Sequence, residues 1–205
     1  MIIEYKILLI SLLSYFFSSI PFSLILPKLF YKVDVRKVGS GNIGATNVYR
    51  ACGIKMAVIC FLCDGLKSLL TIMIARFCFD IAKSYLYIIA IATVFGHVYS
   101  VFLKFNGGKG VATSIFAILS IDPLFAVLFG ILWGVIFYLK KISSLSAILS
   151  FFIIMLLSII SSVYNILWNV SYQSHFYIFL FVFICFTHRQ NIIRIINGTE
   201  GKIKK

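Results

Sequence analysis

Six long runs of apolar residues divide the chain, and they constrain its fold more than any other feature. They cover about Ile7–Pro27, Ile54–Ala75, Ser84–Leu103, Val111–Leu139, Leu145–Tyr164 and Phe176–Thr187. A helix needs roughly 20 residues to cross a bilayer, and four of the runs fit a single crossing. Because 61% of the 205 residues are hydrophobic and only 12% are charged, a soluble core of this size could not bury them. The sequence therefore predicts an all-α polytopic membrane protein.

The basic residues lie in the connections between the runs. The chain has a formal net charge of +13, and the stretch from Lys28 to Lys55 alone holds six basic residues and one acid. Other basic groups lie at Lys104 and Lys109, at Lys140 and Lys141, and in the tail after His188. This pattern is typical of positive-inside topology, and we attribute most of the charge to it rather than to nucleic-acid binding. Anion sites account for the remainder.

The run Val111–Leu139 decides the expected number of crossings. It is long for one crossing and short for two, and Asp122-Pro123 interrupts it with a dipeptide that disfavours a continuous helix. If the basic loops on both sides are cytoplasmic, an even number of crossings must join them. We therefore expect a hairpin here and seven transmembrane helices, with the N-terminus outside and the C-terminus in the cytoplasm. No internal repeat or linker divides the chain, so we expect one domain over residues 1–205.

The first polar segment is GSGNIGATNVYR, Gly39–Arg50. Its glycines and asparagines predict a loop that presents backbone N–H groups to an anion, although an ordinary flexible loop has the same composition. The segment also matches the Gly-x-Gly-x-x-Gly dinucleotide fingerprint. We reject that interpretation, because the fingerprint follows a strand of a parallel sheet and here a basic stretch next to a membrane span precedes it.

The second polar segment, Gly96–Thr113, contains Gly-Gly-Lys-Gly directly before an apolar run. A helix beginning there would direct N–H groups and a partial positive charge at an anion. It is not a Walker A loop, because Gly110 follows Lys109 where that motif has Ser or Thr. His97 lies near the end of a span, where a histidine is by itself more often a hydrogen-bonded structural residue.

The third polar segment, Thr187–Glu200, spaces His188, Asn191 and Arg194 three residues apart. A helix would place them on one face. A basic helix that rests on anionic lipid is the alternative explanation.

Two charged residues lie inside an apolar run. Asp64 and Lys67 are three positions apart in the second run and would share a helical face. Ionisable groups within a membrane are often functional, but a pair that only neutralises itself has the same spacing. The five cysteines lie mostly in apolar runs, and Cys60-x-x-Cys63 has no second pair, so we expect cysteine packing and no metal or other cofactor.

The three polar segments together resemble the bacterial acyl-phosphate-dependent glycerol-3-phosphate acyltransferases. That family has a Ser-Gly-Asn-x-Gly-Ala-Thr-Asn loop, which is similar to Ser40–Asn47. Its Gly-His and Phe-Leu-Lys-Phe-x-Gly-Gly-Lys-Gly-Val-Ala-Thr motifs correspond to Gly96-His97 and Phe102–Thr113, and its His-Arg-x-Asn-Ile-x-Arg … Gly-Thr-Glu motif to His188–Glu200. The chain departs from the family at Ser100 (usually Pro), Asn106 (commonly Lys) and Lys141 (usually Arg).

The resemblance implies a seven-helix enzyme of the bacterial cytoplasmic (inner) membrane that begins phospholipid synthesis. It would transfer an acyl group from acyl phosphate to the 1-hydroxyl of sn-glycerol 3-phosphate, giving 1-acyl-glycerol 3-phosphate (lysophosphatidate) and phosphate. Its partners would be these two substrates, membrane lipid and, functionally, the enzyme that makes acyl phosphate from acyl carrier protein. An acyl phosphate is an activated mixed anhydride, so the reaction requires no cofactor, metal or covalent enzyme intermediate.

The resemblance also implies roles for individual residues. Backbone N–H groups of one loop would cradle the acyl phosphate, basic side chains and glycines of the next segments would bind phosphate, and the C-terminal motif with the serine after Lys141 would orient glycerol 3-phosphate. These substrate-binding residues are Ser40, Gly41, Asn42, Gly44, Ala45, Thr46, Asn47, Arg50, Lys104, Gly108, Lys109, Gly110, Ser144, Asn191, Arg194 and Glu200. His97 or His188 would be the catalytic base, unless the phosphate of the acyl phosphate itself takes the proton.

A transporter of small phosphorylated anions is the competing class. A helix broken at Asp122-Pro123 and charges within the spans would suit it. We favour the enzyme because the polar motifs gather at one predicted face and no inverted repeat is visible. Two acyltransferase signatures are absent from the sequence: the Gly-x-Ser-x-Gly elbow, and the His-x4-Asp pair of the large acyl-CoA-using glycerolipid acyltransferases.

Overall fold

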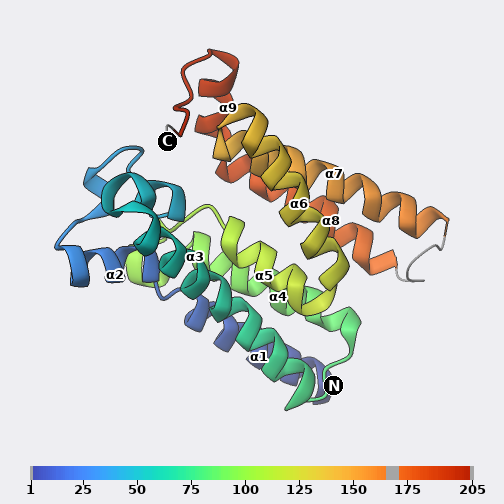
Figure 1. Ribbon diagram of the computed structural model, residues 1–205. Coiled ribbons are helices and arrows are strands. Elements are labelled where there is room, and N and C mark those ends of the chain that lie inside the picture. The colour runs from blue at the N-terminus through green and yellow to red at the C-terminus, as the bar shows by residue number, and fades with distance from the viewer. Residues whose placement is uncertain (1, 165–170, 204–205) are drawn as a thin grey trace. The chain divides into compact units, whose positions relative to one another are not determined.

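The computed structural model describes residues 2–164 and 171–203, and the regular elements there are all helices (Figure 1). The predicted all-α class is therefore confirmed. The chain divides into two compact units, Met1–Ile121 and Asp122–Lys205. The first contains α1 (Ile2–Ser18), α2 (Phe22–Tyr31), η1 (Val35–Lys37), α3 (Ala45–Phe77), α4 (Lys83–Val98), η2 (Val101–Leu103) and α5 (Val111–Ile121); the second contains α6 (Pro123–Lys140), α7 (Ser143–Val163), α8 (Ser171–Thr187) and α9 (Arg189–Ile196).

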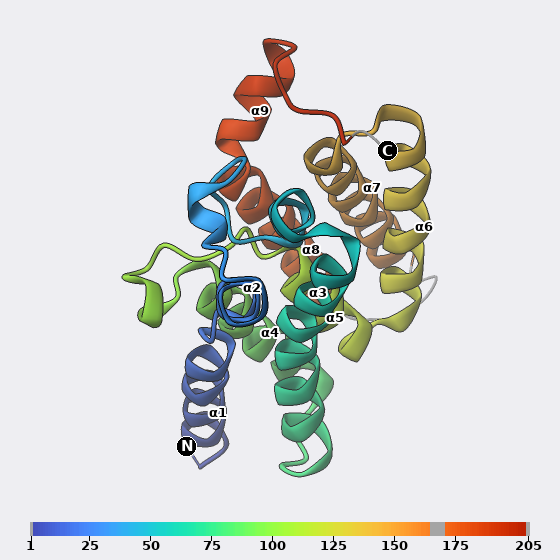
Figure 2. The same ribbon diagram turned by 60° about the vertical axis from the view of Figure 1, so that its left-hand side comes forward.

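In the first unit, α4 packs against α1, α3 and α5, and α3 packs against α2 and α5 (Figure 2). The first apolar run, expected as one helix over Ile7–Pro27, is broken between α1 and α2. Pro21 has no N–H to continue the helical ladder and its ring disfavours a helical Ile20. The break exposes the carbonyl of Ile20 to the middle of the bundle, where Lys67 of α3 donates to it over 2.8 Å.

The helix α3 begins earlier than the apolar run indicates. Ala45, Thr46, Asn47 and Arg50, which the sequence places in a glycine-rich loop, form its first turns, so the loop ends at Gly44. The helical path is interrupted at Gly53, whose backbone has φ 81° and ψ 179°. This kink separates a short amphipathic start, which carries Arg50, from the long apolar part, which carries Asp64 and Lys67.

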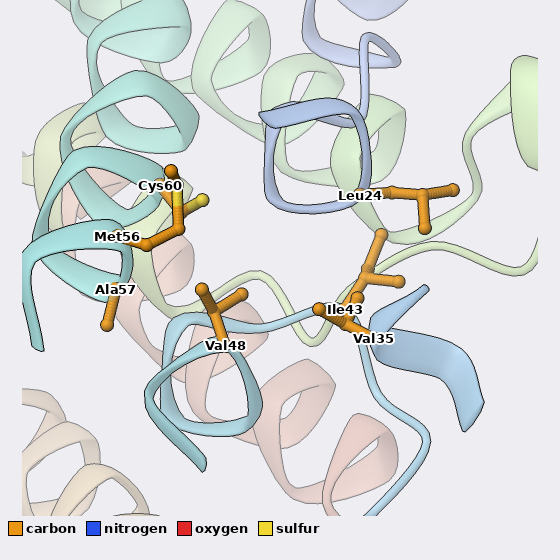
Figure 3. Packing of buried hydrophobic residues seen from close by; sticks show 7 residues of the cluster. All are labelled: Leu24, Val35, Ile43, Val48, Met56, Ala57 and Cys60. Atoms are coloured by element: carbon orange, nitrogen blue, oxygen red, sulfur yellow. The ribbon is translucent and has the colours of Figure 1, made fainter. Parts of the chain in front are cut away.

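A small apolar core fixes the glycine-rich loop to α2 and α3. Val35, which precedes the glycines, and Ile43, which lies between Gly41 and Gly44, are almost completely buried, and they cluster with side chains of the two helices. Figure 3 shows this cluster, which consists of Leu24, Val35, Ile43, Val48, Met56, Ala57 and Cys60. The burial of two residues within the loop gives it a defined path, because displacing them would expose apolar surface to water.

In the second unit, α7 packs against both α6 and α8. Aromatic rings contribute to this packing: those of Phe129 in α6 and Phe151 in α7 lie 4.5 Å apart between centroids, and those of Phe152 in α7 and Phe181 in α8 lie 5.4 Å apart. The chain breaks between α5 and α6 at Asp122-Pro123, as predicted, and Pro123 is the first residue of α6. The carboxylate of Asp122 accepts a hydrogen bond from the Tyr177 hydroxyl over 3.1 Å.

The described helices identify a multi-pass membrane protein. Five candidate spans are long and apolar enough to cross a bilayer, and six if the pair Gln173–Thr187 and Arg189–Ile196, bent by 67°, is one span. Large apolar side chains such as Leu8, Ile131 and Leu139 are more than half exposed and would face lipid. The helix α5 has 11 residues, about half of the roughly 20 that a crossing needs. Seven crossings and the orientation of the termini therefore stay predictions.

Candidate active site

The glycine-rich loop of the first unit uses many of its own backbone donors. The N–H of Gly41 donates to the carbonyl of Val38 and that of Asn47 to the carbonyl of Gly44. The N–H of Gly44 donates to the side chain of Asn42 over 2.9 Å. Within the described part of the chain, Asn42, Ile43 and Ala45 keep backbone N–H groups with no hydrogen-bond acceptor. These groups stand at the N-terminus of α3, where the helix dipole favours an anion.

The side chain of Asn47 holds this loop in shape. It is 2% exposed, and its amide donates to the carbonyls of Val35 and Val38 over 2.7 and 2.9 Å and accepts from the N–H of Ser40 over 3.0 Å. The Asn47 side chain is thus engaged within the loop on both its oxygen and its nitrogen. The sequence identified Asn47 as a site residue, but the pattern gave no indication that its amide closes the loop.

The cations around the loop differ in what they contact. Arg36 binds Asp34, with its Nε and terminal nitrogen donating to the two carboxylate oxygens over 2.9 and 2.6 Å. These hydrogen bonds lower the pKa of Asp34 to about 2, so the carboxylate stays charged and occupies Arg36. Arg50 and Lys104 are exposed, and Lys109 is half-buried. The last three were predicted to neutralise phosphate, and each stands on the first unit close in sequence to a glycine-rich segment.

The Gly107–Gly110 segment packs on the end of α4. The N–H of Gly107 donates to the carbonyl of Val98, and that of Gly108 to the carbonyl of His97. A side chain at Gly107 would overlap the His97 carbonyl, and one at Gly108 would overlap the His97 imidazole at Nε2. The two adjacent glycines therefore allow the loop to lie directly against His97, and α5 begins immediately after it at Val111.

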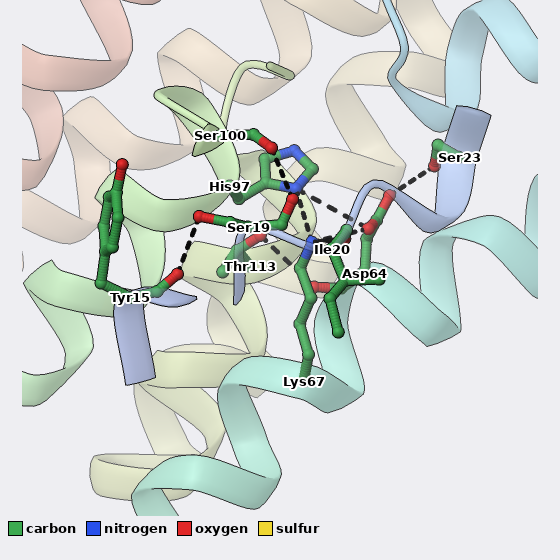
Figure 4. Close-up of polar contacts among 9 residues, drawn as sticks. All are labelled: Tyr15, Ser19, Ile20, Ser23, Asp64, Lys67, His97, Ser100 and Thr113. Atoms are coloured by element: carbon green, nitrogen blue, oxygen red, sulfur yellow. Dashed lines mark hydrogen bonds and ion pairs between the residues drawn. The ribbon is translucent and has the colours of Figure 1, made fainter. Parts of the chain in front are cut away.

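A buried charged cluster links α2, α3 and α4 beside this loop (Figure 4). Lys67 donates to Asp64 over 2.9 Å and lies 3.1 Å from Nδ1 of His97. Asp64 also accepts from the Ser23 hydroxyl through its second oxygen. The sequence predicted the Asp64–Lys67 pair and, separately, His97. It missed Ser23, which has no sequence signal, and the carbonyl of Ile20, whose only signal is the following Pro21.

The second unit has its own polar cluster around the carboxylate of Glu200. One oxygen accepts from the Ser144 hydroxyl over 2.7 Å and from the Asn191 amide, and the other accepts from Nε of Arg194 over 2.6 Å. Burial alone would raise the pKa of Glu200, but these donors outweigh it and lower the pKa below its ordinary value of 4.5. The predicted residues Ser144, Asn191, Arg194 and Glu200 are thus brought together, with Glu200 at their centre.

His188 lies at the junction of α8 and α9 and is 3% exposed. Its Nδ1 lies 2.9 Å from the carbonyl of Ile184, one helical turn earlier. A carbonyl oxygen can only accept, so Nδ1 carries a proton and the lone pair of a neutral ring lies on Nε2. This arrangement suits a proton acceptor.

The three departures from the family motifs have structural counterparts. Ser100 donates to the carbonyl of Ser19 over 2.6 Å and so supports the break between α1 and α2. The Asn106 amide donates to the carbonyl of Lys104. The ammonium of Lys141 lies 4.7 Å from the centroid of the Tyr138 ring, and its backbone carbonyl accepts from Ile203. Among the described residues, no three or more His, Cys, Asp or Glu side chains converge on a possible metal position.

Comparison with known proteins identifies the family. A family model described as "Glycerol-3-phosphate acyltransferase" matches residues 8–198. The glycerol-3-phosphate acyltransferase of Pelagibacter ubique (strain HTCC1062) is 38% identical over 197 residues, which cover 96% of this chain and 97% of the relative. That of Anaplasma marginale (strain Florida) is 43% identical over 192 residues, with 93% and 91% covered.

A solved structure gives the same result. The crystal structure of PlsY, an integral membrane glycerol 3-phosphate acyltransferase, in its glycerol 3-phosphate form has a TM-score of 0.88 and 34% identity, covering 97% of this chain and 96% of that chain. Its lysophosphatidic acid form has a TM-score of 0.86. The apolar helices and the polar clusters of this chain, in a fold shared with a solved acyltransferase, define the class as a multi-pass membrane acyltransferase. The chain belongs to the glycerol-3-phosphate acyltransferase family, which confirms the family predicted from its motifs and excludes the transporter.

Proposed function

We propose that this chain transfers the acyl group of an acyl phosphate to the 1-hydroxyl of sn-glycerol 3-phosphate. The observation that carries the proposal is the ordered set of three motifs in a member of this family. The related PlsY structures, in a glycerol 3-phosphate form and a lysophosphatidic acid form, support it. Lysophosphatidic acid is glycerol 3-phosphate with one added acyl group, so the two forms correspond to the acceptor and the product of an acylation.

The reaction consists of one substitution at the acyl carbon. The hydroxyl oxygen of glycerol 3-phosphate forms a bond to that carbon, and the bond from the carbon to the phosphate oxygen breaks. Inorganic phosphate leaves with the electron pair, and the hydroxyl proton passes to a base. The leaving group is already activated, so the protein's contribution is to position the substrates and to stabilise negative charge.

In the first unit, the N-terminus of α3 binds the phosphate of the acyl phosphate. Its donors are the backbone N–H groups of Asn42, Ile43 and Ala45, with Arg50 one to two turns further along the helix. Lys104 and Lys109 supply additional positive charge. Fewer backbone N–H groups can bind phosphate than the sequence predicted for Ser40–Asn47, because several of them already bond within the loop.

In the second unit, the Glu200 cluster orients glycerol 3-phosphate. A carboxylate would repel the phosphate of this substrate, so Glu200 acts by holding Ser144, Asn191 and Arg194 in place. His188 is the better candidate for a protein base, because the contact of Nδ1 with Ile184 leaves Nε2 as the acceptor in a neutral ring. The phosphate of the acyl phosphate is the alternative proton acceptor.

The cellular setting is proposed from the apolar runs and the basic loops between them. We place the chain in the bacterial cytoplasmic membrane with seven crossings, the N-terminus outside and the basic loops inside. An enzyme that makes acyl phosphate from acyl carrier protein would supply the donor. A cysteine introduced at Asn106 tests the orientation in a Cys78→Ser background, because Cys78 is itself exposed. An impermeant thiol reagent should not reach the new cysteine in intact cells, and its labelling from outside would overturn the topology.

The function is tested with purified protein, palmitoyl phosphate and labelled glycerol 3-phosphate. Lysophosphatidate should form, and acyl-CoA as the sole donor should give little or none. Arg50→Gln should lower the rate strongly, whereas Lys140→Gln, which removes an equally exposed cation outside the motifs, should not. Equal turnover with acyl-CoA, or no product from palmitoyl phosphate in folded protein, would refute the proposal.

A further inference from the structure

The ammonium of Lys67 is fully occupied by three acceptors in the interior of the first unit. They are the carbonyl oxygen of Ile20 at 2.8 Å, a carboxylate oxygen of Asp64 at 2.9 Å and Nδ1 of His97 at 3.1 Å (Figure 4). Lys67 and Asp64 are each 2% exposed and His97 is 5% exposed. An ammonium has three N–H donors, so this arrangement uses every one of them.

These contacts determine where the proton of His97 lies. An ammonium only donates, so a ring nitrogen 3.1 Å from it must accept, and Nδ1 carries no proton. The Asp64 carboxylate oxygen lies 3.7 Å from the same Nδ1, which is too long for a hydrogen bond from it. Transfer of a proton from Lys67 to His97 is disfavoured, because an alkylamine binds a proton far more tightly than an imidazole does. Asp64 further stabilises the charge on Lys67 and is itself held by the Ser23 hydroxyl. The neutral imidazole then keeps its proton on Nε2.

The Nε2–H group faces the Gly107–Gly110 segment, where glycine leaves no side chain over the ring. An added Cβ at Gly108 would lie closest to Nε2 of His97. Among the described residues, Nε2 has no hydrogen-bond acceptor, although the ring is almost completely buried. Nε2 is not one of the fully buried polar atoms that lack a partner, so its N–H can reach an acceptor outside the protein, and it stands beside the N-terminus of α5.

We propose that Asp64 and Lys67 are positioning residues that fix the tautomer of His97, so that His97 donates a hydrogen bond from Nε2 to a substrate oxygen. His97 is then not the base of the reaction. The inference rests on the proposed function for the identity of the substrate but not for the tautomer. An Asp–Lys pair can neutralise itself without any contact to His97. The contact with His97 therefore gives this buried ion pair a second role.

The tautomer can be measured in the unmodified protein. The protein is labelled with ¹⁵N-histidine, and two-bond ¹H–¹⁵N correlation spectra distinguish a protonated ring nitrogen from a bare one. The signal that disappears in His97→Asn is assigned to His97. We expect a neutral ring with a bare Nδ1 and a protonated Nε2. A proton on Nδ1, with or without one on Nε2, would overturn the inference, and no activity is needed to see it.

A neutral-pair variant tests the effect on catalysis. Asp64→Asn combined with Lys67→Met removes both charges together, so no charge is left unpaired in the interior. If the pair serves only to neutralise itself, this variant should turn over like the wild type. If the pair positions His97, kcat should fall by a factor on the order of 10²–10³, the effect of losing one aligned donor, while KM for the two substrates changes much less. Wild-type kcat in the folded double variant would refute the positioning role.

Two controls separate this effect from damage to the bundle. Ser68→Ala removes a buried hydroxyl next to Lys67 that bonds to Thr93 over 3.0 Å and, within the described part of the chain, is not hydrogen-bonded to His97, and its kcat should stay within a few-fold of the wild type. Thermal unfolding shows whether the double variant is folded. If it is not, the spectrum of the wild-type protein decides the question. An inactive wild type with the expected tautomer would refute the proposed function and leave this inference standing.

Discussion

Replacing Asn47 with alanine should damage the glycine-rich loop more than any other single amide deletion there. The change removes hydrogen bonds to the carbonyls of Val35 and Val38 and from the N–H of Ser40. At about 0.5–1.5 kcal/mol each, the three bonds contribute about 1.5–4.5 kcal/mol. The two carbonyls keep other donors, from Val38 and Gly41, so Ser40 N–H is the group left without its acceptor.

The lost hydrogen-bond free energy lowers the rate of catalysis, because an open loop must close again when the acyl phosphate binds. Every 1.4 kcal/mol is a factor of ten, so kcat/KM for the acyl phosphate should fall by about 10- to 10³-fold. The matched control is Asn42→Ala. The Asn42 side chain accepts one hydrogen bond, from the N–H of Gly44, so its loss should cost about 0.5–1.5 kcal/mol and at most about tenfold.

The assay is initial-rate kinetics with palmitoyl phosphate, together with thermal unfolding of each purified variant. The prediction requires that Asn47→Ala be the less stable and the less active of the two. If the two variants have the same kcat/KM and the same melting temperature, the hydrogen bonds of Asn47 do not shape the loop.

Two further predictions concern other parts of the structure. Gly41 has φ 72°, whereas Gly44 does not lie in the left-handed region. Gly41→Ala should therefore lower the melting temperature, and Gly44→Ala should fold normally but lose turnover by about 10²–10³-fold if phosphate approaches its backbone. Normal turnover in folded Gly44→Ala would exclude that approach. Because the pKa of Glu200 is lowered below 4.5, its bonds stabilise the fold above that pH and are lost as pH falls through the native pKa. The wild type should therefore lose more thermal stability than Glu200→Gln between pH 7 and pH 4, and parallel losses would show that Glu200 does not stabilise the fold in this way.

The sequence by itself determined the class of the protein and most of the residues at its polar clusters. Apolar runs of about 20 residues leave the bilayer as the only solvent that fits, and this property does not depend on how the helices pack. The break at Asp122-Pro123 was equally local, because a proline ring disfavours a helical residue before it in any context. The motifs gave the family, because their residues and their order along the chain can both be read from the sequence.

Only the tertiary structure decided what those residues do. Asn47, His97 and Glu200 each stood in a motif, but their hydrogen-bond partners lie elsewhere in the chain: Val35 for Asn47, Lys67 for His97, and Ser144 for Glu200. The early start of α3 was not foreseen, since it depends on the buried apolar partners of the loop. The break at Pro21 has a local cause, but the use of the freed Ile20 carbonyl by Lys67 depends on packing. A residue's type limits which hydrogen bonds it can make, whereas the partner that approaches within 3 Å is set by packing between distant segments.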